Sequence, residues 1–483
     1  MGGVYTIYCY FNSEQIQGIL NAVVMLVGSS GVDGDYLSLV RVAAILGLFM
    51  AVCYGFLRAR GEDAAHYLLM VAIFYSTLFV PRVTVQIEDH GGAGTGAPIV
   101  VDNVPLGLAF FASSTSHIGY WLTEKMETFF SLPDTSLQLS QHGLMGGPRA
   151  MRVAQSAAMP DPVLAQDMIN FMRDCINPEL VASPTLVNAL LTSTNIWNDL
   201  GPTGIGVLNP GRMVTLSGAT GAVTCDDAYT NKLGPRLAPA ATSEFARIAQ
   251  MLSPNAPVAT AQTMLTALLP AAESLIMTSS ASTTEGIRQR MMINMLNDTS
   301  ANMAQIMNDP SAAQTALGAA MAASNANTAY AVMARLAQET LPLVRNSIEL
   351  VVLGVFPIVL ILIIIAGSKG GMVLRSYVIT MLWIQLWAPL YAIVNYVGTM
   401  AGAKSMKAAL SSVDGISVTN AAQLLNTTIS AEAIAGMLTI SVPMIALAII
   451  KGGETALSGI SAGITGPADR SANKVGEQVG SGN

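Results

Sequence analysis

Three apolar stretches in the last third of the chain decide the fold. They read LVVLGVFPIVLILIIIA at Leu350–Ala366, SYVITMLWIQLWAPLYAIVNYVGTM at Ser376–Met400 and AIAGMLTISVPMIALAII at Ala433–Ile450. Each is an uncharged run of about 17 to 25 residues, which is the length that crosses the hydrocarbon core of a bilayer as a helix. Buried helices of a soluble protein are the alternative, but three such runs in succession are unusual in a water-soluble core. The sequence therefore predicts membrane-spanning helices.

The composition of the whole chain agrees with a membrane protein. Of its 483 residues, 52% are hydrophobic and only 11% are charged. A soluble domain carries about 25% charged residues. The net charge of −7 also argues against direct binding of nucleic acid, which requires a basic face. Membrane lipid is thus the first expected partner.

Two further apolar runs near the N-terminus predict a transmembrane hairpin. They are Leu37–Leu57 and Ala64–Val80, separated by the short sequence RARGED. Arg41 lies inside the upstream edge of the first run, where its long side chain can reach the lipid headgroups. With the three C-terminal runs, this gives about five transmembrane helices.

Positive charge in the short loops predicts the orientation. Arg58 and Arg60 occupy the hairpin loop, and Lys369 and Arg375 follow the run that ends at Ala366. Loops rich in Lys and Arg stay in the cytoplasm. The long segment Pro81–Arg345 then lies outside, on the side of the membrane away from the cytoplasm.

The predicted fold class is mainly α: a polytopic helical membrane protein with a large, mostly helical periplasmic domain. Its predicted parts are an N-terminal interfacial segment (1–35), a transmembrane hairpin (36–80), the periplasmic domain (81–345), a C-terminal transmembrane region (346–451) and a flexible tail (452–483). Within the domain, Val83–Ile87 alternates like a strand, and Ser311–Leu341 is rich in helix-forming alanine. Apolar residues spaced three and four apart predict amphipathic helices around Leu265–Leu269 and Ile287–Met295.

The run Ser376–Met400 leaves two topologies open. Gln385, Pro389 and Asn395 interrupt it. A single tilted helix is favoured and places the C-terminus in the cytoplasm. Two re-entrant half-helices would place it outside. Pro342, before the run at Leu350, is expected to bend or break the helix that precedes it.

Catalytic and cofactor motifs are missing from the sequence. The glycine-rich segments Gly91–Gly96 and Gly201–Gly206 lack the Lys-Ser/Thr pair of a phosphate-binding loop. The four histidines have no metal-ligand spacing, and no GxSxG motif occurs. We therefore expect no enzyme activity, cofactor or metal.

The order of several motifs resembles the N-terminal region of the TraG family of conjugative transfer proteins. These are VQIED (Val85–Asp89), VDNVPLG (Val101–Gly107), NFMRDCINPE (Asn170–Glu179), VTCDDA (Val223–Ala228), GVFPIVL (Gly354–Leu360) and the WxQxWxPLY core that begins at Trp383. The resemblance covers nearly the whole chain. VDNVPLG and the WxQxWxPLY core are its most specific parts.

The resemblance implies a polytopic inner-membrane component of a conjugative type IV secretion system. It would act as an assembly platform or channel subunit in pilus assembly, and in mating-pair stabilisation. Implied partners are other secretion subunits, pilin, further copies of the same chain and a secretion ATPase that supplies energy in trans. A permease or channel for small solutes is the alternative, although permeases usually show more spans and an internal repeat.

The same resemblance places Cys175 and Cys225 in the large loop. A periplasmic loop is open to oxidation, so we expect these cysteines to pair. Two free buried thiols are the alternative. Cys9 and Cys53 are expected to fill apolar space.

Polar and aromatic residues in or beside the spans are candidates for helix contacts. Arg41 and Glu349 lie near span ends, where headgroups can solvate them. Gln385 lies centrally in its run and should bond to another helix or to lumen water. Trp383 and Trp387, which share a helix face, are further candidates. The last candidate is Pro389, which should kink the helix.

Overall fold

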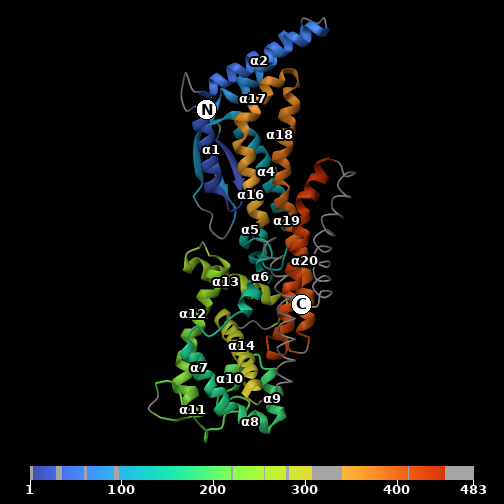
Figure 1. Ribbon diagram of the computed structural model, residues 1–483. Coiled ribbons are helices and arrows are strands. Elements are labelled where there is room, and N and C mark those ends of the chain that lie inside the picture. Colours follow the sequence, from blue (N-terminus) through green and yellow to red (C-terminus); the bar gives the residue numbers. More distant parts are fainter. Residues whose placement is uncertain are drawn as a thin grey trace, which may run out of the picture.

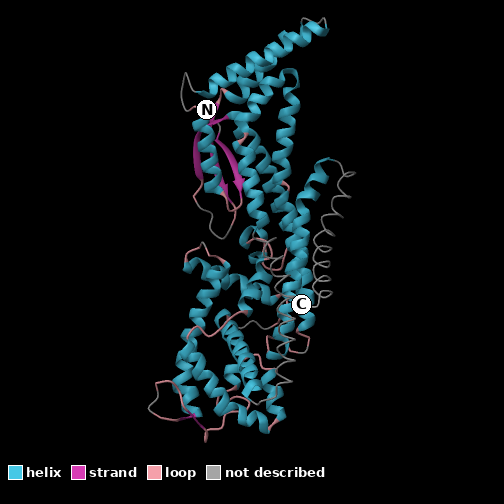
Figure 2. Cartoon of the chain, in the orientation of Figure 1, coloured by secondary structure: helices cyan, strands magenta, loops and turns pink. Residues whose placement is uncertain are grey.

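The computed structural model is an elongated, mainly helical molecule (Figure 1). It describes residues 4–28, 35–58, 62–91, 97–218, 221–254, 256–278, 282–306, 340–411 and 413–451. A small sheet and α2 (Asp35–Arg58) lie toward one end, and a helical body lies at the other (Figures 1 and 2). The predicted helix Ser311–Leu341 and the tail 452–483 fall almost entirely outside the described residues.

The remaining helices divide into two groups. The first is α1 (Ser13–Val27), α3 (Glu62–Phe74), α4 (Leu106–Phe129), α16 (Leu341–Gly354), α17 (Phe356–Ala366), α18 (Gly370–Gln385), α19 (Trp387–Ala409) and α20 (Val418–Lys451). The second forms the body: α5 (Leu139–His142), α6 (Gly146–Gln155), α7 (Pro162–Phe171), α8 (Asn177–Ala182), α9 (Pro184–Leu191), α10 (Ile196–Asp199), α11 (Cys225–Asp227), α12 (Gly234–Leu252), α13 (Val258–Ser274) and α14 (Thr283–Ile306).

A three-stranded sheet organises the N-terminal end. Its central strand β2 (Arg82–Asp89) pairs in parallel with β1 (Val4–Cys9) and antiparallel with β3 (Ile99–Pro105). The predicted alternation at 83–87 is confirmed, with Val85 and Ile87 buried. β1 comes from the segment expected to be interfacial. A second, two-stranded sheet joins β4 (Met213–Val214) to β5 (Val223–Thr224) in the body.

α1 covers the sheet. Its buried residues recur at three and four (Ile16, Leu20, Val23, Val24 and Val27), so the helix is amphipathic. The apolar face packs on β3 and α16 of the same chain. α4 also packs against β1 of the sheet. The same helix contacts α18 and α19.

Three described helices are long and apolar enough to cross a membrane. They contain Tyr36–Cys53, Gly370–Ala409 and Val418–Lys451. The bent pair α16–α17 makes a fourth if it counts as one span. The predicted span Ala64–Val80 is a shorter apolar stretch, Ala65–Phe79, that ends in a π-helical turn. By length and composition, the described helices therefore provide three or four candidate spans, which is fewer than the five predicted.

The bend in the α16–α17 pair lies at Val355. The two helices meet at 48°. Pro357, in the first turn of α17, cannot donate a hydrogen bond to the carbonyl of Leu353. Pro342 stands in the first turn of α16, where proline is tolerated, and the helix that it was predicted to bend or break lies outside the described residues.

The body shares one hydrophobic core with the tip of the α19–α20 hairpin. α6, α7, α12, α13 and α14 pack together with residues from both arms of that tip, among them Met406, Ile416 and Leu424. The predicted amphipathic helices are confirmed as α13 and α14, with Leu265, Leu269, Ile287 and Met291 buried. The tip of the hairpin is thus packed into the body.

Candidate functional site: a buried charged network around Gln385

Gln385 is the last residue of α18. α19 starts two residues later, and Pro389 lies in its first turn. Pro389 has no N–H to donate to the carbonyl of Gln385, so the helix hydrogen bonding is interrupted here. The N–H of Leu386 still reaches the carbonyl of Leu382 at 3.1 Å. The two helices together form one 40-residue candidate span.

The side chain of Gln385 joins two charged residues of α16. Its Nε2 donates to Oε1 of Glu349 at 2.6 Å, and its Oε1 accepts from a terminal nitrogen of Arg345 at 3.0 Å. Arg345 and Glu349 are themselves an ion pair at 3.4 Å, one helical turn apart. The three side chains therefore close a ring of polar contacts between α16 and α18.

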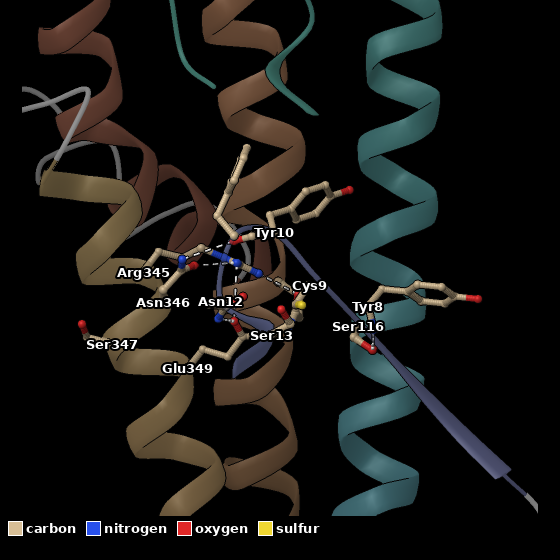
Figure 3. Close-up of polar contacts among 12 residues, drawn as sticks. Tyr8, Cys9, Tyr10, Asn12, Ser13, Ser116, Arg345, Asn346, Ser347 and Glu349 are labelled. Carbon is tan, nitrogen blue, oxygen red and sulfur yellow. Dashed lines mark hydrogen bonds and ion pairs between the residues drawn. The ribbon is translucent and has the colours of Figure 1, made fainter. Parts of the chain in front are cut away.

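The turn between β1 and α1 completes the network. Asn12 donates through Nδ2 to Oε2 of Glu349 at 3.1 Å, and Asn346 donates to the carbonyl of Tyr10 at 3.3 Å. Figure 3 shows Arg345, Asn346 and Glu349 on one helix, facing the segment that carries Asn12. Hydrogen bonds, one of them to the charged Glu349, thus connect the turn between β1 and α1 to the apolar helix α16.

Protein atoms enclose the network on all sides. Arg345 is 3% exposed, Glu349 4% and Gln385 7%. Gly119 of α4 lies so close that a Cβ there would come within 2.9 Å of the Cβ of Gln385. Buried charges are tolerated only when they are paired and hydrogen-bonded, which makes each member dependent on the others.

The tryptophans pack within the chain. Nε1 of Trp383 donates to the carbonyl of Pro443 in α20 at 3.0 Å. Trp387 meets the Trp383 ring edge-on, at 5.1 Å between centroids, and is buried with Val442 and Ala446. Both tryptophans therefore pack against α20 of the same chain. Arg41 is exposed on α2 and does not join the network.

Asn395, a polar interruption of its apolar run, and Glu432, which the sequence did not single out, fasten α19 and α20 to the body. Asn395 accepts from the N–H of Met145 at 2.7 Å and donates to the carbonyl of Leu137 at 2.9 Å. Glu432, fully buried in α20, pairs with Arg152 of α6 at 2.8 Å. Arg345 was missed as well, although its spacing of four residues from Glu349 is a readable signal for a helical ion pair.

The cysteines of the body are joined in the structure. Cys175 and Cys225 form a disulfide with 5.8 Å between their Cα atoms, and both are buried. Cys9 and Cys53 are free. Burial raises the pKa of the Cys9 thiol well above its ordinary value, which disfavours the reactive thiolate form.

The site holds segments together, and its chemistry is that of fixed hydrogen bonds. In the described part of the chain, no three His, Cys, Asp or Glu side chains lie close enough to share a metal ion. The network acts by positioning: it fixes the register between α16, α18 and the β1–α1 turn.

Comparison with known proteins identifies the family. The family model described as TraG-like protein, N-terminal region, matches residues 6–473. Protein TraG of Escherichia coli (strain K12) is 22% identical over 393 residues, which is 80% of this chain and 40% of that protein. No solved structure matches the chain. This chain spans about 40% of the length of its curated relative. Because the family model covers nearly every residue, the chain belongs to the TraG-like family of conjugation proteins, in its N-terminal region.

Proposed function

We propose that this protein is an inner-membrane assembly platform or channel subunit of a conjugative type IV secretion system, acting in pilus assembly and in mating-pair stabilisation. The observation that carries the proposal is the family match over residues 6–473, which makes the chain a conjugation protein. Candidate membrane-spanning helices accompany that match. A small-solute permease finds no support in the same comparison.

The hairpin α19–α20 supports a platform that links membrane helices to an external body. α18 and α19 together run for 40 residues. At 1.5 Å per residue this is about 60 Å, roughly twice the hydrocarbon core. The excess length continues into the body, so a force or displacement in the body reaches the spans through continuous helices.

The tip of the hairpin is held by the body. Nε2 of Gln289 donates to the carbonyl of Ile416 in the tip and to that of Ser193, both at 2.9 Å. Asp414 accepts from the N–H of Thr278 at 3.0 Å. The tip and the body must therefore lie on the same side of any membrane that the hairpin crosses. The positive loops favour the periplasm for that side.

The partners follow from this role. We expect homo-oligomers, contacts with pilin and other secretion subunits, and energy from a secretion ATPase in trans. Affinity purification of the tagged protein from a conjugating donor should recover these components.

Deletion of the gene in a donor strain tests the function. We expect loss of transfer and of pili seen by electron microscopy, both restored by the gene in trans. Mating on a solid surface, which removes the need for stable pairs in liquid, separates a pilus defect from a pair-stabilisation defect. Wild-type transfer and normal piliation in the deletion strain would overturn the proposal.

A further inference from the structure

The three-stranded sheet lies beside the apolar helices, at the level of Gln385. The N–H of Tyr8 in β1 donates to Oγ of Ser116 in α4 at 3.2 Å. Three residues further along α4, a Cβ on Gly119 would come within 2.9 Å of the Cβ of Gln385. Buried residues of all three strands share one hydrophobic core with α16, α17 and α18. The sheet therefore stands alongside these helices (Figure 2), although the sequence assigns β2 and β3 to the external domain.

This level falls inside any bilayer that α18 and α19 cross. The apolar run Ser376–Met400 is about 37 Å long as a helix, and the hydrocarbon core of a bilayer is about 30 Å thick. Gln385 lies about 14 Å from one end of that run, so every segment of about 30 Å within the run includes it. The strand β1 is therefore at the depth of the hydrocarbon core.

The two faces of the sheet differ in chemistry. Side chains alternate between the faces of a strand, and Val85, Ile87 and Val101 are buried in the core that the sheet shares with the helices. The strand register places the alternate residues together on the outer face, and none of them is buried. They are Val4, Thr6 and Tyr8 of β1, Thr84, Gln86 and Glu88 of β2, and Val100 and Asp102 of β3. Most of this face is thus polar, and it includes two carboxylates.

One edge of the sheet is open as well. Among the described residues, β3 pairs with β2 alone. Its other edge therefore offers backbone N–H and C=O groups to the surroundings. The opposite edge, at β1, is covered by α4, where Ser116 accepts the N–H of Tyr8.

Lipid is an unfavourable neighbour for this side of the molecule. At membrane depth, an open sheet edge occurs only where protein covers it or water reaches it. Carboxylates at that depth face the protein interior or a water-filled cavity. The flank formed by α20, on the other side of the apolar helices from the sheet (Figure 1), is different: its exposed residues from Ile434 to Ile449 are Ile434, Met444 and Ile449, all apolar. The protein thus has a polar and an apolar flank within the same bilayer.

We propose that the outer face of the sheet borders a water-filled channel at membrane depth. Water satisfies the open edge of β3 and solvates Glu88 and Asp102, while the α20 flank meets lipid. The eight side chains of the outer face include two carboxylates and no cation, so this wall favours cations over anions. The inference deepens the channel role given under Proposed function and rests on it.

Two cysteine variants at similar depth carry the test. Val100→Cys places a thiol on the outer face of the sheet, level with Thr6 of β1. Met444→Cys places a thiol on α20, next to Pro443, whose carbonyl accepts from Nε1 of Trp383 at 3.0 Å. Both parent side chains are apolar and exposed, Val100 at 53% and Met444 at 38%. The two sites therefore differ mainly in what surrounds them.

Fluorescence quenching of a bimane label on each thiol measures those surroundings. Both variants also carry Cys53→Ser, because Cys53 is an exposed free cysteine, whereas Cys9 is buried and the other two are paired. The full-length protein is reconstituted into lipid vesicles with iodide on both sides, or into vesicles of lipid with dibrominated chains. We expect iodide to quench the label at position 100 about fivefold more strongly than the label at position 444, and the brominated lipid to give the reverse order.

Each other result overturns the proposal. Strong quenching of the label at position 100 by brominated lipid means that the sheet faces lipid. Equal quenching of both labels by iodide means that this depth lies outside the bilayer. If neither agent quenches the label at position 100, another protein chain covers the face. The readout is solvent access and not transfer, so a negative result leaves the assembly role in conjugation standing.

Discussion

Replacing Gln385 with leucine tests whether the network ties α18 to α16 and whether conjugation depends on it. The change removes the amide that bridges Glu349 and Arg345. Leucine fills a similar volume but offers no donor or acceptor. Both charges remain buried, at 4% and 3% exposed, with fewer partners.

The expected loss of stability follows from the two bonds. Hydrogen bonds to charged groups contribute about 1.5–3 kcal/mol each, so two amount to at least about 3 kcal/mol. An average hydrogen bond between membrane helices contributes about 0.6 kcal/mol. The larger figure applies because removing a partner from a buried charge leaves that charge without compensation. The ratio of unfolded to folded protein should then rise about a hundredfold.

Tryptophan fluorescence can follow the unfolding in detergent, since Trp383 and Trp387 lie within two residues of Gln385. Gln423→Leu is the matched control, because Gln423 is an exposed glutamine in α20. We expect Gln385→Leu to remain in the membrane fraction, to unfold earlier than the control, and to lower conjugative transfer or disrupt oligomers. Equal midpoints for the two variants would refute the energetic reasoning. A lower midpoint with wild-type transfer and the same oligomer would leave Gln385 as a structural contact only.

Three further predictions concern the body and its location. The pairing of Cys175 with Cys225 closes a loop of 50 residues, which should stabilise the body by about 4 kcal/mol. Mass spectrometry of unreduced peptides from periplasmically oxidised protein should find the linked pair. Complete alkylation of both cysteines without reductant would exclude the disulfide. Alkaline phosphatase fused near Ala240 should be active and the same fusion in the RARGED loop inactive, while the reverse pattern would contradict the predicted orientation. Burial raises the pKa of the Asp167 carboxyl, but the N–H of Ser217 at 2.7 Å and Arg236 at 2.6 Å outweigh burial and hold that pKa below its usual value. The carboxylate therefore stabilises the body above about pH 4 and loses this contribution as the pH falls through its folded pKa. The Asp167→Asn variant should unfold more readily than the wild type at pH 7 and approach it in acid. A constant difference in stability between the two proteins at all pH values would count against this assignment.

The apolar helices could be predicted from the sequence because composition alone defines them. The runs at Leu350, Ser376 and Ala433 lie in α16–α17, α18–α19 and α20. The lengths of these helices could not be predicted with the same accuracy. The run Ser376–Met400 lies within the 40 residues of α18 and α19, since hydropathy marks the apolar part of a helix and says nothing of the polar turns that continue it.

The sheet could be predicted only in part. The alternation at Val83–Ile87 is local and readable. Its pairing with β1 joins Val4 to Thr84, eighty residues apart, and no local pattern reports such a contact. The same limit hides the structural role of the N-terminal segment, whose strand β1 forms one edge of the sheet.

Polar interruptions of the apolar runs turn out to mark where the rest of the chain attaches. Gln385 meets Arg345 and Glu349 of α16, Asn395 meets the backbone of Leu137 and Met145, and Glu432 meets Arg152. The sequence shows that such residues need partners, because an amide or carboxylate within an apolar helix is costly alone. It cannot name the partners, since Asn12 and Glu349 lie 337 residues apart. These three residues join the apolar helices α18, α19 and α20 to α16 and to the body, so a polar residue in a span of this chain marks a point of attachment.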